Sequence, residues 1–297
     1  MTVFTARPVS KETHILAEGP VWTGIGDEVI WVDLERGQVF EGRFVNGLIE
    51  QSTRHDFDGT VGAVVKSVDG HLLVAGQHEL VVVTPSGERI TGPRIIADQA
   101  HRRTNDGACD PAGRFLIGTL SLDNVEGGES LVRIEDDATS SVIDDNLTLS
   151  NGLAWSPDGT LLYSTDTVPG IIWVRDYDAV SGSVGQRRQH LAITGGFPDG
   201  LCVDSLGFLW VAIWGASEIR SFAPDGAAAD TVEVAAPHPS SVAFIGEKLD
   251  TLLITTASRD LSAEESVLYP DAGRLFTADV GVTGTATFPW SGSWLGT

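Results

Sequence analysis

Short runs of hydrophobic residues recur along the whole chain, and each run follows a turn signal. The clearest runs cover residues 28–33, 71–75, 114–118, 160–164, 208–212 and 251–255. The turns before them are centred on Gly26, Asp69, Ala112, Asp158, Leu206 and Leu249, so successive repeats are 43, 43, 46, 48 and 43 residues apart. A nearly fixed period of this length is typical of a repeat architecture. The pattern therefore indicates six similar units.

Each unit has the pattern of a four-stranded antiparallel sheet. In the fourth unit, a run at residues 151–155 enters a turn in which Pro157 fixes φ and Gly159 supplies a positive φ. A second strand follows at once, a third is expected at residues 171–175, and the fourth is weaker and more polar. Alternation and β-branched residues favour strands over helices. We predict an all-β, six-bladed β-propeller with four antiparallel strands per blade.

The same pattern bears on how the ring closes and how the chain is divided. No linker or low-complexity segment interrupts the repeat, so we expect a single domain over residues 1–297. A propeller must close on itself, and the run at residues 3–7 is the N-terminal segment that can complete the last blade. We expect it to lie beside residues 273–280.

The composition indicates a protein with a substantial hydrophobic core and a strongly acidic surface. Hydrophobic residues make up 42% of the chain, and the formal net charge is −22. The negative potential opposes binding to nucleic acids and to anionic membranes, and no basic patch offsets it. The two cysteines, Cys109 and Cys202, provide no disulfide framework and are expected to be small core residues. No signal peptide and no apolar run of roughly 20 residues are visible, so we expect a cytoplasmic protein. We also expect it to be monomeric or weakly oligomeric.

Polar residues occupy the strands that should line the central channel, where small or apolar residues are expected. These strands begin near residues 18, 60, 105, 150, 198 and 240, and four of the six place an acid or amide before a glycine. One such dipeptide is an ordinary turn signal. Four occur in matching register, counting Asp106-Gly107 directly after Asn105, so we expect Glu18, Asn105, Asn151 and Asp199 at one end of the channel. Carboxylate and amide oxygens are the ligands of a hard cation. We therefore predict a divalent metal site at the mouth of the channel.

An ordered set of motifs resembles the regucalcin–gluconolactonase family of six-bladed propellers, which includes luciferin-regenerating proteins. The resembling stretches are AEGPVW at 17–22, RTNDG at 103–107, DPAGR at 110–114, LSNGLAWSPDG at 149–159, FPDGLCVD at 197–204 and LWVAIWG at 209–215. Together they cover nearly the whole chain, and the ordered set is far more specific than any single motif.

The resemblance implies roles for individual residues. It implies a divalent metal ion held by Glu18, Asn151 and Asp199. Asn105 matches a residue near the metal that contacts substrate or ligates the ion, and Arg103 matches a substrate-binding arginine. A further substrate contact falls near Asp123, although residues 120–125 depart from the commonest family pattern. Ligation by oxygen alone favours Ca²⁺, while Zn²⁺, Mg²⁺, Mn²⁺ and Fe²⁺ also accept such ligands.

The activity implied by the resemblance is metal-dependent hydrolysis of a sugar lactone, such as gluconolactone, to the aldonic acid. The cation can polarise the lactone carbonyl, and Asp199 is the candidate general base for water. Arg103 and Asn105 can hydrogen-bond the ring hydroxyls or the carbonyl. Two alternatives remain open: a phosphotriesterase-like hydrolase on the same scaffold, and a non-enzymatic calcium-binding propeller.

Other catalytic schemes lack their motifs. The sequence contains no nucleophile elbow, no phosphate-binding loop and no pair of histidines with zinc-protease spacing. Trp22, Trp155 and Trp214 are expected to pack in the core rather than to form platforms for a sugar.

Overall fold

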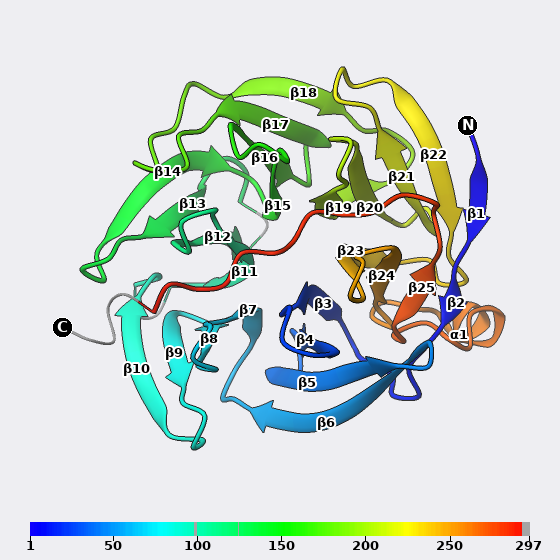
Figure 1. The fold of residues 1–297 in the computed structure, drawn as a ribbon, viewed down its shortest axis with the longest axis horizontal. Coiled ribbons are helices and arrows are strands. Elements are labelled where there is room, and N and C mark those ends of the chain that lie inside the picture. The colour runs from blue at the N-terminus through cyan, green and yellow to red at the C-terminus, as the bar shows by residue number, and fades with distance from the viewer. Residues whose placement is uncertain (98–99, 124, 293–297) are drawn as a thin grey trace.

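The strands form six sheets arranged around a central channel, as the blades of a propeller (Figure 1). The computed structural model describes residues 1–97, 100–123 and 125–292. The predicted all-β fold with six antiparallel blades is confirmed. Helix is almost absent from the described residues: α1 (Ala263–Leu268) is a short connection that begins with a capping box between Ser262 and Glu265. No helix in this part of the chain has the length and apolar character needed to cross a bilayer.

Blades 1 to 3 each contain four strands that follow one another along the chain. Blade 1 consists of β3 (Ala17–Trp22), β4 (Glu28–Asp33), β5 (Gln38–Val45) and β6 (Leu48–Asp56). Blade 2 consists of β7 (Val61–Lys66), β8 (Leu72–Gly76), β9 (Glu79–Val83) and β10 (Arg89–Arg94). Blade 3 consists of β11 (Arg102–Cys109), β12 (Phe115–Ser121), β13 (Glu129–Ile134) and β14 (Ser140–Leu147).

Blades 4 to 6 continue the repeat, and the last two include strands from the N-terminus. Blade 4 consists of β15 (Ser150–Trp155), β16 (Leu161–Asp166), β17 (Ile171–Asp176) and β18 (Arg188–Ala192). Blade 5 consists of β19 (Phe197–Val203), β20 (Leu209–Trp214), β21 (Glu218–Phe222), β22 (Ala228–Glu233) and β1 (Val3–Thr5). Blade 6 consists of β23 (Pro239–Ile245), β24 (Thr251–Thr256), β25 (Phe276–Ala278) and β2 (Arg7–Pro8).

The N-terminal segment closes the ring differently from the prediction. Arg7 pairs with Thr277 in the last blade, as expected, but Val3–Thr5 leaves that blade and adds to the outer edge of blade 5. There β1 pairs with β22 in parallel, with Phe4 opposite Val232. The pairing in blade 6 is short because β2 has two residues and ends at Pro8, which lacks an N–H to donate. The free edge of β22 accepts the remaining residues, so the segment ties two blades together.

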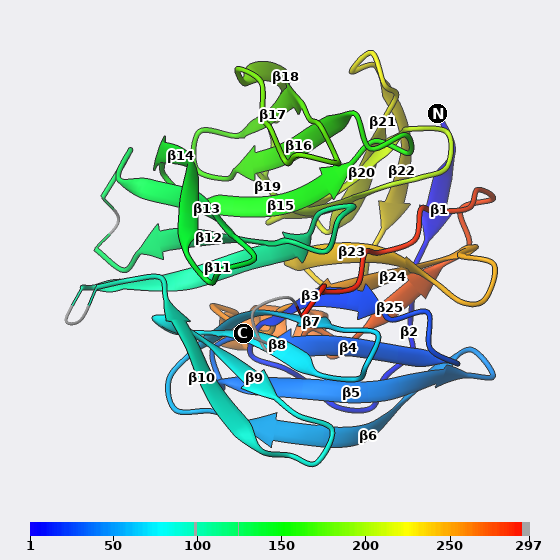
Figure 2. The ribbon, with the colours of Figure 1, turned by 60° about the vertical axis from the view of Figure 1, so that its left-hand side comes forward.

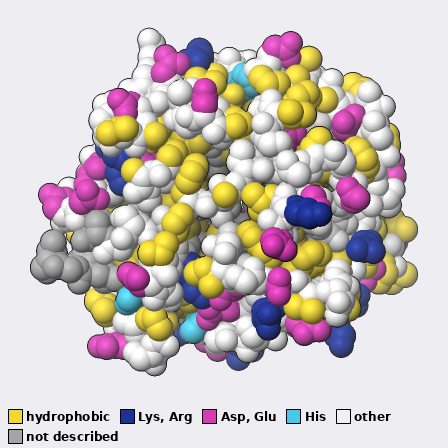
Figure 3. Space-filling view, in the orientation of Figure 1, with side chains coloured by type: hydrophobic (Ala, Val, Ile, Leu, Met, Phe, Trp, Pro, Cys, Tyr) yellow, Lys and Arg dark blue, Asp and Glu magenta, His cyan; other side chains and the backbone are white. Residues whose placement is uncertain are grey.

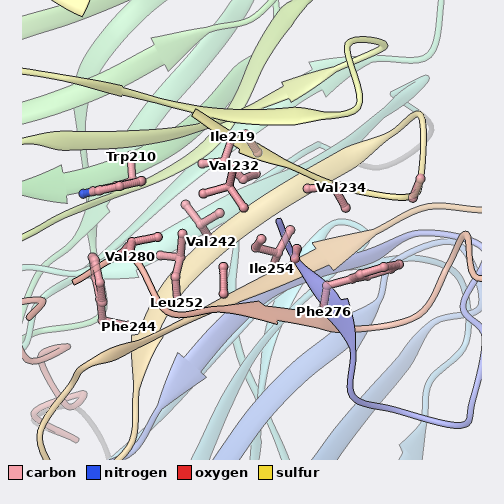
Figure 4. Packing of buried hydrophobic residues seen from close by; sticks show 14 of the residues in the cluster. Trp210, Ile219, Val232, Val234, Val242, Phe244, Leu252, Ile254, Phe276 and Val280 are labelled. Carbon is pink, nitrogen blue, oxygen red and sulfur yellow. The ribbon is translucent and has the colours of Figure 1, made fainter. Parts of the chain in front are cut away.

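Neighbouring blades pack face to face around the channel (Figures 1 and 2). Figure 4 shows the hydrophobic cluster between blades 5 and 6, in which Trp210 and Val232 face Val242, Leu252 and Phe276. Each of these side chains is nearly or completely inaccessible to solvent. Burial of one large apolar side chain contributes about 1.5–3 kcal/mol relative to its exposed state, so these layers hold neighbouring blades together.

A C-terminal segment, residues 279–292, crosses the channel from blade 6 to blade 2, and we call it the strap (Figure 1). Thr285 donates through its N–H to the carbonyl of Val203, and the Thr287 hydroxyl donates to the carbonyl of Trp22. Near the end of the strap, Trp290 is 2% exposed in the hydrophobic core between blades 2 and 3. Figure 3 shows the face that the strap crosses, where acidic side chains outnumber basic ones.

The six inner strands β3, β7, β11, β15, β19 and β23 contact one another in turn and form the wall of the channel. The strap bonds to the C-terminal ends of β3 and β19, so the opposite mouth lies where these strands begin. A chamber of about 110 Å³ lies at the strap end. Both free cysteines, Cys109 and Cys202, line it, and burial raises the pKa of each thiol.

His14 links the closing blade to blade 1 through a buried imidazole. Its Nδ1 lies 2.8 Å from the carbonyl oxygen of Gly273, and the indole Nε1 of Trp31 donates to its Nε2 at 3.0 Å. This arrangement uses Nδ1 as a donor and Nε2 as an acceptor, so the ring is neutral. Burial lowers the pKa of His14.

We expect the acid sensitivity of folding to depend on His14. In the unfolded chain the ring takes up a proton near pH 6.5, whereas the folded ring does so only at lower pH. The unfolded state therefore binds more protons between these values, and the free energy of unfolding falls as the pH drops below about 6.5. His14→Gln keeps a donor and an acceptor without titrating. Urea titrations between pH 7.5 and 5 should show a shallower loss of stability in this variant, and equal slopes would contradict the assignment.

Candidate functional site

The mouth of the channel opposite the strap holds a cavity of about 290 Å³. Five of the residues predicted from the sequence line it: Glu18 from β3, Arg103 and Asn105 from β11, Asn151 from β15, and Asp199 from β19. Four different blades therefore supply polar side chains to one cavity. All five residues are at least nine-tenths buried, although the cavity itself is open to solvent.

A β-bulge in each inner strand positions these side chains. The ladder to the next strand is irregular at the same place in all six blades, between residues 18–21, 61–63, 104–107, 151–153, 198–201 and 239–241. A bulge leaves residues outside the regular ladder and redirects their side chains. The residues before glycine that the sequence pattern selected fall at these irregularities and not in tight turns.

The glycines are required because neighbouring inner strands approach closely. A Cβ on Gly200 would lie 2.1 Å from the Ser241 hydroxyl oxygen, and one on Gly62 would lie 2.3 Å from the carbonyl oxygen of Asn105. Gly152 combines a φ of +22° with an approach of 2.6 Å to the carbonyl oxygen of Asp199. Larger residues at these positions would push the strands apart and move the side chains that line the cavity.

A chain of hydrogen bonds connects the polar residues of three blades. Arg103 Nη1 donates to Asn105 Oδ1 at 2.6 Å, and Asn105 Nδ2 donates to Asn151 Oδ1 at 3.0 Å. Asn151 Nδ2 donates to the Thr167 hydroxyl at 3.1 Å, which in turn donates to the carbonyl of Pro198 at 2.8 Å. These bonds fix the orientation of both amides. Asn151 Oδ1 retains a second lone pair that can face a ligand.

Three carboxyl groups, two at the mouth and one on the strap side of them, lie close enough to affect one another. Burial raises the pKa of Glu18 well above its usual range, and the charges of Asp199 and Asp106 add to this effect. The pKa of Asp199 is raised in the same way, first by burial and then by Asp106. Burial also raises the pKa of Asp106 to about 6. The protein alone therefore stabilises the ionised forms of this group poorly.

One buried guanidinium offsets part of this negative charge. Arg103 is 7% exposed, and its pKa is lowered to about 10 by burial and by the charge of Arg259. Glu18 and Asp199 act in the opposite direction on the same group. Arg103 stays protonated at neutral pH and can donate to a ligand in the cavity, but it cannot ligate a cation.

The residues at the mouth fit a divalent cation in charge and in chemistry. Asp199 Oδ1 is buried and has no hydrogen-bond partner among the described residues, which a cation would correct. Among those residues, no cluster of three or more His, Cys, Asp and Glu side chains is arranged to hold a metal ion. The predicted ligand set contains two such side chains, Glu18 and Asp199, and its third member is the amide of Asn151.

The remaining predicted contact lies elsewhere. Asp123 is not one of the described residues that line the cavity; its side chain is 57% exposed and lies 2.7 Å from His101 Nδ1. Trp22 and Trp155 are buried, as expected, whereas Trp214 is only partly buried and lines the cavity.

Four other polar or charged residues at the site were not assigned a role from the sequence. Thr167, Arg259 and Asp260 line the cavity, and Asp106 lines the chamber on the strap side. Asp106 could have been found, because it stands before Gly107 in the same acid–glycine pattern. Arg259 and Asp260 lie in the segment after β24, where no repeat pattern marks them.

Comparison with known proteins shows which family the chain resembles. The family described as "SMP-30/Gluconolactonase/LRE-like region" matches residues 16–258. The 6-deoxy-6-sulfogluconolactonase of Pseudomonas putida is 30% identical over 95% of this chain and 97% of that protein. The pentonolactonase of Haloferax volcanii is 31% identical over 92% and 94%, and regucalcin of Danio rerio is 30% identical over 98% and 100%.

A solved structure has the same fold as this chain. The calcium-binding protein regucalcin from Agrobacterium tumefaciens superposes with a TM-score of 0.91 at 25% identity, over 98% of this chain and 99% of that one. The matched region includes every inner strand and the five sequence-predicted residues that line the mouth of the channel. The chain is therefore a member of the SMP-30/gluconolactonase/LRE-like family.

Proposed function

We propose that the protein hydrolyses a sugar lactone, such as gluconolactone, with the help of one divalent metal ion. The observation that carries the proposal is the unpartnered Asp199 Oδ1, buried beside Glu18 at an open cavity that also contains a guanidinium. The lactonase names of relatives at about 30% identity support the same reaction class. A binding-only propeller has no need for Arg103 beside the ligand set.

Glu18, Asn151 and Asp199 would hold the metal, and oxygen donors alone favour Ca²⁺. When bound, the ion would polarise the lactone carbonyl and offset the two carboxylates. Arg103 and Asn105, already joined at 2.6 Å, would bind the carbonyl side or the ring hydroxyls of the substrate. Asn105 is held in place by Ser150 and Asn151, so its orientation is set before substrate arrives.

We assign the proton transfer to Asp199. Its carboxylate would accept a proton from water as the water oxygen bonds to the lactone carbonyl carbon. The ring C–O bond then breaks, and the same proton passes to the departing ring oxygen, which becomes the hydroxyl of the aldonic acid. Arg103 would stabilise negative charge on the former carbonyl oxygen during this step.

A substrate panel tests the proposal directly. Chelator-treated and Ca²⁺-restored protein should be assayed in parallel on gluconolactone, a pentonolactone and an organophosphate triester. We expect lactone hydrolysis that disappears with chelation and returns with metal. Turnover of the triester alone would assign a phosphotriesterase, and metal binding without any turnover would assign a non-enzymatic protein.

Metal binding should also raise the free energy of unfolding. Ca²⁺ at about 100 times its dissociation constant should raise the free energy of unfolding by about 2.7 kcal/mol, because it binds only the folded state. Asp199→Asn should lose most of this gain. In chelator it should unfold at or above the wild-type temperature, because one buried carboxyl has been removed. Asp123→Asn, an exposed carboxylate, is the matched control and should respond as wild type. Equal Ca²⁺ responses in both variants would refute the ligand assignment.

Substitution of Arg103 should weaken substrate turnover without weakening metal binding. Arg103→Ala should lower kcat/KM about 10-fold to 100-fold, through loss of a charged hydrogen bond of about 1.5–3 kcal/mol. Metal affinity should stay the same or rise slightly, because a like charge near the ion has been removed. Lactone kinetics and calorimetric Ca²⁺ titration on the same preparation check both parts. Arg188→Ala, which removes an exposed arginine of β18, should change neither.

A further inference from the structure

We propose that Trp214, Arg259 and Asp260 form a subsite that recognises the hydroxylated ring of an uncharged sugar lactone. This inference rests on the proposed function, because it names the substrate class of the same cavity. The three residues line the cavity together with the five predicted ones. They come from the end of β20 and from the segment that follows β24, so blades 5 and 6 build this wall.

Trp214 provides a fixed apolar surface at the wall of the cavity. The His238 imidazole stacks against its indole, with ring centroids 4.3 Å apart and planes inclined by 10°. That contact occupies one face, so the cavity meets the remaining face or the edge of the ring. Phe197 pairs with Trp214 across the ladder, and Asp199 follows two residues later on the same strand. The C–H groups of a sugar ring form an apolar patch that packs against such an indole.

Asp260 and Arg259 provide polar groups beside this surface. Arg259 Nε lies 2.9 Å from Asp260 Oδ2, and its Nη1 lies 2.7 Å from Glu35 Oε1. The backbone N–H groups of Ser258 and Arg259 both donate to the carbonyl of Ile15, which ties the segment to the start of blade 1. The backbone before Asp260 is therefore held in place, whereas the Asp260 side chain is 70% exposed and its Oδ1 forms no ion pair with a described residue.

The charges of Arg259, Asp260 and Glu35 favour an uncharged group in the part of the ligand that meets this subsite. The single guanidinium of Arg259 already faces two carboxylates, Glu35 and Asp260, so it offers little net attraction to an anion. Asp260 would repel a phosphate, sulfonate or carboxylate carried by the substrate. Ring hydroxyls, in contrast, can donate to Asp260 and accept from Arg259 at the same time. A polyol can satisfy both partners, whereas an unsubstituted lactone ring has no hydroxyl to donate to Asp260.

The test compares lactones that share a ring but differ in substituents. Gluconolactone carries the hydroxyls, δ-valerolactone lacks them, and 6-phosphogluconolactone adds an anion. Trp214→Leu should lower kcat/KM for gluconolactone about 10-fold, mainly through KM, and should change δ-valerolactone turnover less than about 3-fold. Asp260→Asn should lower gluconolactone kcat/KM about 3-fold to 10-fold and should raise that for 6-phosphogluconolactone.

A matched tryptophan controls for loss of packing. Trp173→Leu removes another partly buried indole, which packs under Arg187 in blade 4 away from the cavity. It should leave all three substrates unaffected. Equal losses on gluconolactone and δ-valerolactone in Trp214→Leu would overturn the subsite, since the residue would then only support the cavity. A wild-type preference for 6-phosphogluconolactone that Asp260→Asn does not strengthen would also overturn it.

Binding of a lactam separates this inference from the proposed function. Gluconolactam keeps the hydroxylated ring and resists hydrolysis, so calorimetric titration measures the subsite without turnover. If wild-type protein hydrolyses no lactone, the proposed function fails. The subsite still stands if the lactam binds and Trp214→Leu weakens that binding about 10-fold. If the lactam does not bind, or binds both proteins equally, the subsite is refuted.

Discussion

The close approach of six inner strands around one axis is the constraint on which the rest of this structure depends. At the bulges of blades 4 and 5, a Cβ added to Gly152 or Gly200 would lie 2.6 Å or 2.1 Å from an atom of the next inner strand. Glycine therefore occupies those positions, and the preceding side chain is turned towards the channel mouth. Chains that pack this tightly deform little, so the polar groups at the mouth stay where the strands place them. The acid–glycine and amide–glycine pairs thus serve packing and chemistry together.

Without a ligand, this site lowers the stability of the folded protein. Glu18 and Asp199 are desolvated and repel each other, and Arg103 is desolvated as well. Groups buried in this way lower stability unless a ligand compensates them. The surrounding blades supply the compensating stability through apolar layers such as the one between blades 5 and 6. Packing in a rigid scaffold commonly compensates for the lower stability of a functional site.

The sequence predicted the parts of the structure that repeat. Regular spacing predicted six blades, and equivalent register predicted that Glu18, Asn151 and Asp199 would line one cavity. Parts that depend on unrelated segments were missed. Trp214 ends an apolar run and reads as a core residue, but its environment is set by His238 from another blade. Likewise, no local signal directs Val3–Thr5 to the edge of blade 5, because that choice depends on which strand edge remains free.

The pairing of the N-terminus with β22 and β25 has a consequence for how the protein is made. Residues 3–8 are synthesised long before their partners, which lie at residues 231–233 in β22 and at residues 276 and 277 in β25. The earlier blades can form during synthesis, but the outer edge of blade 5 can be completed only after β22 has been made, and that of blade 6 only after β25. Until then, the N-terminal strand and the sheet edges that it will join are unpaired. In this state the segment can pair with another copy of the chain. Rapid synthesis of the chain as far as β25 therefore favours a correctly closed ring over an entangled pair.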